Sequence, residues 1–168
     1  WSSSRCRTSS PAPNATATGP RLNVEHPLHS PHRGTLMDSM HSIDLSTALT
    51  RFNDHWSPRI VADVNGQHVK IAKFSGAFDW HSHAEADELF LVLEGAFTME
   101  FRDHAVELTK GQMLVVPRGV EHRPVADAEC AVMLVEPAGL VNTGDGAETE
   151  RSTCGDWLIE PLSKTGAG

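Results

Sequence analysis

The middle of the chain alternates apolar and polar residues with a period of two, which is typical of strands with one buried face. The clearest case is the segment 96–102, in which Phe97, Met99 and Phe101 share one parity and polar residues share the other. Side chains two apart on a strand point to the same face. The pattern therefore predicts a half-buried strand in this segment.

Several neighbouring segments repeat this pattern and are separated by turn residues. We expect further strands at 59–64, 67–74, 81–83, 88–93, 106–108, 112–116, 121–125 and 129–136. Asn65-Gly66 indicates a hairpin turn between the first two, because both residue types tolerate positive φ. About eight or nine short strands at this spacing predict an all-β fold, a double-stranded β-helix or jelly-roll barrel.

One short helix is expected before the strands, in residues 42–53. Its apolar residues at helical spacing are Leu45, Ala48, Leu49 and Phe52. Ser42 or Asp44 would cap its start. We expect this helix to cover one face or one end of the barrel.

The chain divides into three parts by composition. Residues 1–40 are rich in Ser, Thr and Pro and poor in residues to bury, which predicts a disordered N-terminal extension. Residues 41–137 carry the strand pattern and form the predicted barrel domain. Residues 138–168 are expected to be a C-terminal loop and tail that packs on the barrel.

Composition excludes several classes of function. The 168-residue chain has a formal net charge of −8, which argues against a nucleic-acid-binding surface. No apolar run approaches the roughly 18 residues of a membrane-spanning helix. The three cysteines, Cys6, Cys130 and Cys154, are far apart and odd in number, so we expect no disulfide framework and a reducing, cytoplasmic setting.

Three histidines and one glutamate are the candidate metal ligands. His81 and His83 are two apart and would share one face of a strand. Glu88 heads the apolar run 89–93, where a charge is costly unless it is paired or coordinated. His122, from a later strand, would complete a mixed N/O set that suits one divalent transition metal ion, Fe, Mn, Zn or Ni.

These residues lie in two stretches that resemble the paired motifs of the cupin superfamily. The first is G-A-F-D-W-H-S-H-A-E-A-D-E-L-F-L-V-L-E-G, from Gly76 to Gly95, and the second is G-Q-M-L-V-V-P-R-G-V-E-H, from Gly111 to His122. Two positions depart from the family pattern. Gly76 is one residue nearer the histidine pair than usual, and Ala126 stands where asparagine is frequent. Neither departure removes a metal ligand.

The resemblance implies a small-molecule site inside the barrel. Phe90 and Val92 share parity with Glu88 and are expected to line it, with Phe97 and Met99 on the next strand. Trp80, beside the histidine pair, is expected to shape the entrance.

The general pattern is similar to the small one-domain cupins grouped loosely with mannose-6-phosphate isomerases. No cluster of Lys or Arg marks a sugar-phosphate pocket, and a shared fold does not fix an activity. One hypothesis is a metal-dependent dioxygenase or isomerase, with Glu88 as ligand or catalytic base. The alternatives are a non-catalytic ligand-binding or sensor module and a structural metal barrel, the last disfavoured because four ligands leave open coordination positions. By analogy we also expect a homodimer that pairs through residues 59–74.

Overall fold

The computed structural model describes residues 42–146 and 148–159 of the chain. The predicted extension at 1–40 lies outside this part. The described residues form one helix, α1 (Leu45–Leu49), and eight strands, which confirms the all-β prediction. The strands are β1 (Arg59–Val64), β2 (Gln67–Ala77), β3 (Glu88–Glu94), β4 (Ala96–Phe101), β5 (Ala105–Thr109), β6 (Met113–Val116), β7 (His122–Pro137) and β8 (Asp156–Trp157).

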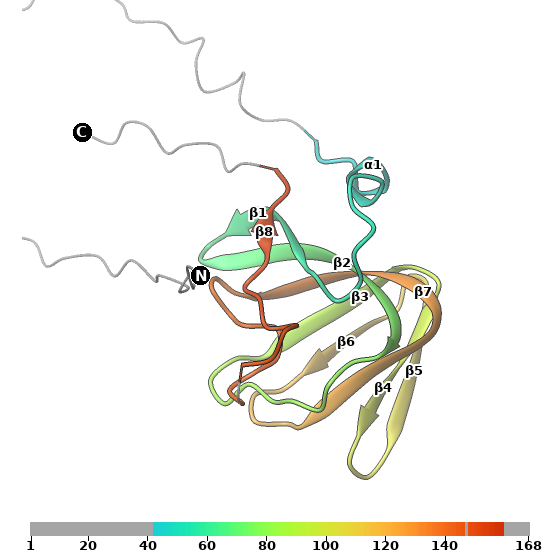
Figure 1. Cartoon of the computed structure of the whole chain (residues 1–168), viewed down its shortest axis with the longest axis vertical. Coiled ribbons are helices and arrows are strands. Elements are labelled where there is room, and N and C mark those ends of the chain that lie inside the picture. The colour runs from blue at the N-terminus through green and yellow to red at the C-terminus, as the bar shows by residue number, and fades with distance from the viewer. Residues whose placement is uncertain (1–41, 147, 160–168) are drawn as a thin grey trace, which may run out of the picture.

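The strand β7 is the one around which the barrel is assembled (Figure 1). It pairs antiparallel with β4 near its start, with β3 near its end and with β2 along its length. The sequence predicts two strands in this region, whereas the structure has one continuous strand. A register shift of β2 against β7 between Phe74 and Gly76 accommodates this long strand, because such irregularities bend a sheet.

The predicted strand at 81–83 is a second difference. These residues form a loop between β2 and β3, and only His81 makes an isolated bridge, with His122. The two histidines do reach the same cluster, as their spacing predicted, but they do so from a loop and not from a paired strand.

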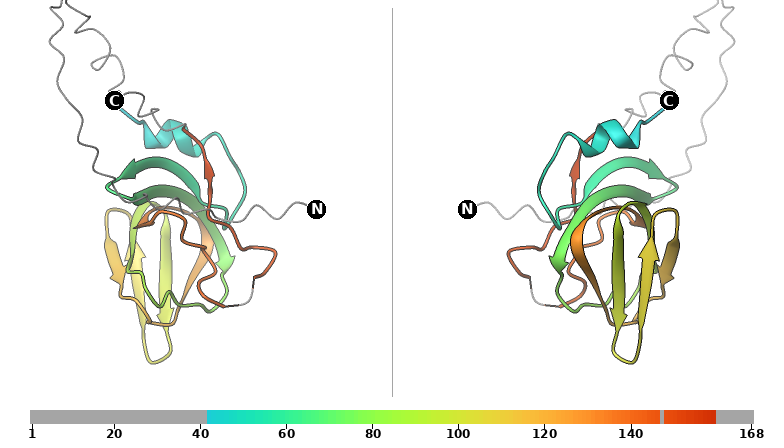
Figure 2. Two further views of the ribbon diagram at one scale, coloured as in Figure 1. Left: turned by 90° about the vertical axis from the view of Figure 1, so that its left-hand side faces the viewer. Right: turned by 90° about the vertical axis from the view of Figure 1, so that its right-hand side faces the viewer.

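The helix α1 is shorter than the predicted 42–53 segment. Asp44 is its N-cap, and its side chain accepts a hydrogen bond of 3.0 Å from the backbone N–H of Thr47. Ala48 and Leu49 pack against Val61 of β1 and Ile71 of β2. The helix thus covers the outer side of these strands, at one end of the molecule (Figure 2).

The interior of the barrel is filled by side chains of even-numbered residues from β2, β3 and β7. Its cluster includes Phe74, Phe90, Val92, Val132 and Leu134. In a barrel of this size the lining is the core, so the residues that line a site are also those that hold the fold together.

The segment after β7 returns to the sheet. β8 pairs in parallel with β1, and the backbone N–H of Leu158 donates to Ile60. Cys130 is a free, buried thiol. No helix in the described ranges is long and apolar enough to cross a membrane.

Candidate metal centre

The four predicted ligands come together at one end of the barrel interior. His81 and His83 lie on the loop before β3, Glu88 is the first residue of β3, and His122 is the first residue of β7. All four side chains are buried, and one potential ligand atom from each lies within 4.8 Å of the others. Sequence positions far apart therefore form a single cluster.

Backbone hydrogen bonds fix the loop that carries two of these histidines. The N–H of His81 donates to the carbonyl of His122 over 3.1 Å, and the N–H of His122 donates to the carbonyl of His81 over 2.9 Å. The N–H of Gly119 donates to the carbonyl of His83 over 2.7 Å. The second motif thus holds both histidines of the first in place.

Two imidazoles are oriented by their own backbone neighbourhood. The Nδ1 of His81 lies 2.9 Å from the carbonyl of Asp79, and the Nδ1 of His122 lies 3.0 Å from the carbonyl of Val120. A carbonyl only accepts, so both Nδ1 atoms carry the proton and both Nε2 atoms keep a lone pair. Histidines that ligate metals are commonly oriented in this way.

The inward-facing atoms lack partners among the described residues. The Nε2 atoms of His83 and His122 and the Oε2 of Glu88 are buried and make no hydrogen bond within the described residues. That oxygen lies 3.5 Å from His83 Nε2 and 3.4 Å from His122 Nε2. Neighbouring ligands about 2.1 Å from one ion are roughly 3.0 to 3.4 Å apart, depending on geometry, so the cluster fits a divalent transition metal.

Electrostatics favour the metal-binding protonation states. Burial, reinforced by the neighbouring His122, lowers the pKa of His81 to about 4, so this imidazole is neutral at pH 7. Burial alone would raise the pKa of Glu88, but the nearby His122 and His83 side chains hold it well below its usual range. A neutral imidazole and an ionised carboxylate are the forms that bind metal ions.

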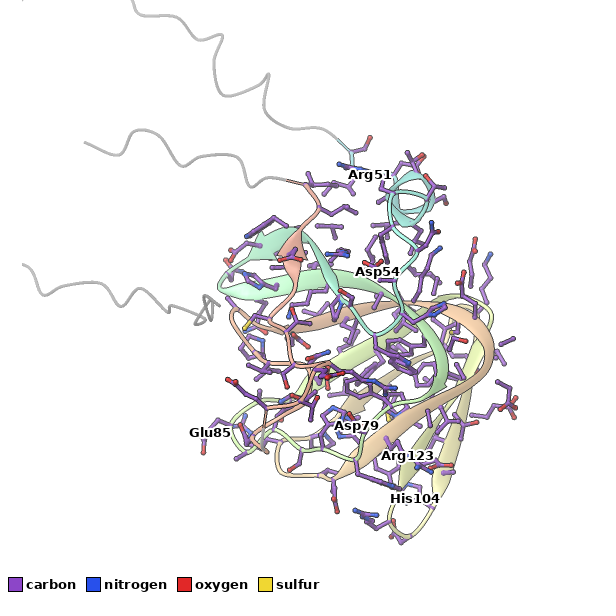
Figure 3. The ribbon with its side chains drawn as sticks, in the orientation of Figure 1. Arg51, Asp54, Asp79, Glu85, His104 and Arg123 are labelled. Carbon is purple, nitrogen blue, oxygen red and sulfur yellow. The ribbon has the colours of Figure 1, made fainter. Side chains whose placement is uncertain are left out.

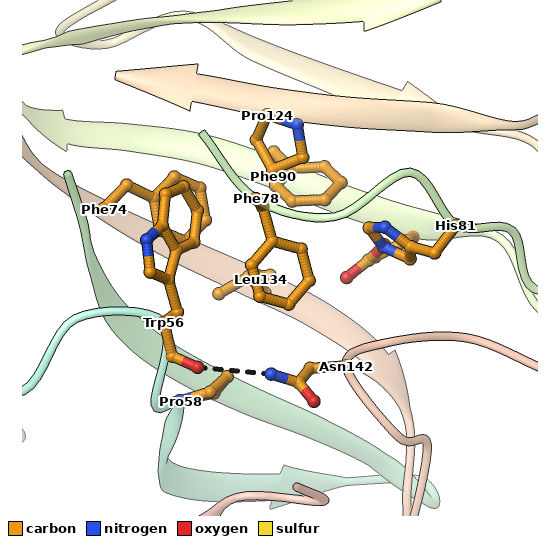
Figure 4. A pocket seen from close by; sticks show the side chains of 10 residues that line it. Trp56, Pro58, Phe74, Phe78, His81, Phe90, Pro124, Leu134 and Asn142 are labelled. Atoms are coloured by element: carbon orange, nitrogen blue, oxygen red, sulfur yellow. Dashed lines mark hydrogen bonds between the residues drawn. The ribbon is translucent and has the colours of Figure 1, made fainter. Parts of the chain in front are cut away.

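A small apolar pocket adjoins the cluster (Figure 4). Its lining residues are Trp56, Pro58, Phe74, Phe78, His81, Glu88, Phe90, Pro124, Leu134 and Asn142. The Trp56 ring stacks on Phe74, with centroids 4.5 Å apart. The amide of Asn142 is engaged in the wall, since it donates to the carbonyl of Trp56 over 3.2 Å.

Of the five residues predicted to line or flank the pocket, one lies in the cavity wall of the structure. Phe90 lines the cavity, whereas Val92, Phe97 and Met99 lie in the core cluster and outside the cavity lining. Trp80 is half-buried, and the guanidinium of Arg102 lies 3.9 Å from its ring centroid. Trp80 is therefore part of a cation–π stack and does not line the cavity.

Sequence reasoning missed several cavity residues. Phe74 and Leu134 follow the even parity of the barrel interior and were predictable on that ground. Trp56 and Asn142 lie outside the strands and carried no periodic signal. Another histidine, His104, is exposed at the tip of the β4–β5 hairpin, away from the cluster (Figure 3).

A buried ion pair near the cluster was also missed. Lys70 of β2 and Glu136 of β7 have side chains that are 0% and 2% exposed, and they pair inside the barrel. Burial, together with the nearby Glu88 charge, raises the pKa of Glu136, and the Lys70 ammonium opposes this shift. Their even numbers and strand positions indicated an interior location, but nothing in the sequence indicated that they would pair.

Comparisons with known proteins agree with this architecture. The cupin domain family model matches residues 67–136. A cupin-2 domain protein of Shewanella frigidimarina, known from its crystal structure, is 45% identical, with 56% of this chain and 93% of that chain covered and a TM-score of 0.56. Protein NMB1881 of Neisseria meningitidis is 30% identical, with 58% and 99% covered and a TM-score of 0.54.

One curated relative adds to these structures. The uncharacterized protein YdbB of Bacillus subtilis is 41% identical over 64 residues, which cover 38% of this chain. The match spans only 57% of the length of that relative. With the family model, the solved structures and the barrel in agreement, the chain belongs to the cupin superfamily.

Proposed function

We propose that this cupin binds one divalent transition metal ion through His81, His83, Glu88 and His122, and uses it to hold a small molecule. The observation that carries the proposal is that His81 and Glu88 belong both to the cluster and to the cavity lining. A molecule that fills the cavity would therefore reach the ion. Four ligands on a six-coordinate ion leave two positions for such contact.

The cavity chemistry supports a particular class of small molecule. Among its ten lining residues there is no Lys or Arg, and the polar side chains are those of His81, Glu88 and Asn142. A phosphate or free carboxylate would find no cationic side chain in this wall. We infer a ligand with an apolar, preferably aromatic body and one oxygen-bearing end directed at the ion.

The cavity-lining residues also limit which reactions the site could support. A bound Fe, Mn, Zn or Ni ion would supply Lewis acidity, and in the first two cases redox chemistry, to that oxygen-bearing end. His81 and Glu88 are the only titratable groups in the lining, and both are proposed ligands. Glu88 is the one carboxylate in the lining, and as a proposed ligand it is not free to serve as a dedicated base. This favours an oxygenase over an isomerase, which needs a dedicated group to move a proton.

Non-catalytic binding is the second candidate function. The absence of an independent acid or base in the cavity lining supports it equally well. In this alternative the ion anchors a ligand whose presence is sensed without turnover.

Oxygen uptake separates the two candidates. Protein loaded with Fe(II) is mixed with phenols, diketones or thiols, and calorimetry measures binding in parallel. Uptake that needs both metal and substrate supports the oxygenase, whereas metal-dependent binding without uptake supports the sensor. Leu134→Phe, which narrows the cavity, should weaken ligand binding and leave the metal stoichiometry unchanged. Ligand binding that is equally tight without metal would contradict both functions.

A further inference from the structure

Lys70 and Glu136 are a buried ion pair that neither the metal cluster nor the cavity lining includes. Their side chains are 0% and 2% exposed. Desolvating two charges offsets most of their mutual attraction, so replacing such a pair by apolar residues is often neutral or stabilising. Stability alone therefore gives little reason for this pair, and its position suggests another role.

Strand register brings Glu136 next to a proposed ligand. Leu89 of β3 pairs with Val135 of β7, and the next residue on each strand is Glu88 and Glu136. Both side chains are buried, Glu88 with 3% and Glu136 with 2% of its surface exposed. Two acidic residues at adjacent cross-strand positions repel each other unless a third group compensates.

Lys70 is that third group. Its Nζ pairs with Oε1 of Glu136 and lies 3.4 Å from the carbonyl of Leu140, at the start of the C-terminal segment. The contacts thus run from the Leu140 backbone through Lys70 to Glu136, which the strand register places beside Glu88. Oε2 of Glu88 faces His83 and His122 and remains without a hydrogen-bond partner, as a ligand atom should.

We propose that Lys70 and Glu136 are positioning residues that hold the Glu88 carboxylate in the orientation needed to bind the metal. The proposal rests on the metal site of the proposed function. Residues that support a metal ligand by hydrogen bonding commonly change metal affinity by about 10- to 100-fold when they are replaced.

Metal titration of four variants tests this role, with Co²⁺ as the probe. Glu136→Leu removes the polar group beside Glu88 and should weaken Co²⁺ binding by about 10- to 100-fold. Glu136→Gln keeps a side chain that can hydrogen-bond Glu88 and should stay within a few-fold of the wild type. Lys70→Met leaves two carboxyl groups without their cation and should also weaken binding. Val132→Ala, buried on the same strand, is the control that should lower stability but leave affinity unchanged.

The visible spectrum of bound Co²⁺ reports the geometry of its ligands. A substitution that only lowers the stability of the fold should leave this spectrum unchanged. We expect a shifted ligand-field band in Glu136→Leu and an unshifted band in Glu136→Gln and Val132→Ala. If Glu136→Leu does not fold, Lys70→Met decides, with the same expected loss.

Two failures are distinguishable. Wild-type protein that binds no Co²⁺ would contradict the proposed function itself. Wild-type binding with equal affinity and an identical spectrum in Glu136→Leu and Lys70→Met would overturn the positioning role and leave the metal site standing.

Discussion

The backbones of His81 and His122 are joined by two reciprocal hydrogen bonds of 3.1 and 2.9 Å, and their ring centroids are 4.3 Å apart. This bridge connects the two halves of the candidate centre without a strand ladder between them. Ligand placement consequently depends on the loops around the bridge as well as on the barrel strands.

Gly144 is the position where this dependence is easiest to test. Its φ is +73°, and a Cβ built there would lie 2.3 Å from the carbonyl oxygen of Ser82, between the two histidines of the first motif. We expect Gly144→Ala to lower the free energy of unfolding by about 1–3 kcal/mol, as strained backbone sites do, and to weaken metal binding. Thermal unfolding and metal titration measure the two effects.

Gly146 is the matched control for this substitution. A Cβ at this position meets nothing within 4 Å, so Gly146→Ala should leave both stability and metal affinity nearly unchanged. Equal behaviour of the two alanine variants would show that the loop does not constrain the histidine pair.

Two aromatic residues near the site should differ sharply in their contribution to stability. Phe90 is 2% exposed and lines the cavity, so Phe90→Ala should cost about 3–5 kcal/mol. Trp80 stacks under Arg102 at the surface, so Trp80→Ala should cost only about 0.5–1 kcal/mol and leave metal binding intact. Chemical denaturation measures both, and a loss of metal binding in Trp80→Ala would place that residue in the site after all.

The Cys130 thiol should be inert in the folded protein. Its side chain is fully buried, and burial raises its pKa to about 11, so the reactive thiolate is scarce at pH 8. Mass spectrometry after iodoacetamide treatment should find the Cys130 peptide unmodified in native protein and modified in urea. Equally fast labelling in both states would mean that the barrel opens around β7.

Association into a homodimer remains a proposal, and exposed apolar residues support it. Met113 and Val115, on β6, are 64% and 46% exposed, and β6 pairs only with β3 in the described chain. We expect light scattering to give twice the chain mass at micromolar concentration, and Met113→Glu with Val115→Glu to reduce it. An unaffected dimer would favour pairing through residues 59–74, and a monomeric wild type would contradict the dimer.

The sequence predicted the fold and the clustering of the three histidines with Glu88, because both depend on local, repeated signals. Period-two alternation gave the strands, and Asn65 and Gly66 adopt the positive φ expected of the hairpin turn, +55° and +78°. The cluster followed from two motifs whose residues the barrel brings together.

The remaining features depend on contacts that no local pattern encodes. Trp56 reaches the cavity wall from a loop, with φ of +60°, and Asn142 does so from the C-terminal segment. Phe97 and Met99 point into the barrel as predicted, but they pack in the core away from the cavity. The alternation along a strand shows which face a side chain is on, but not how far along the barrel axis it lies. The Lys70–Glu136 pair needed the register of two strands to become visible.

Metal content tests the central claim most directly. Protein purified without a histidine tag or chelator is analysed by plasma mass spectrometry beside His122→Ala, with folding of both verified by circular dichroism. The account predicts about one equivalent of Fe, Mn, Zn or Ni in the wild type and a large loss in a folded His122→Ala variant. A wild type that holds no metal, and takes up none when each ion is added, would contradict it.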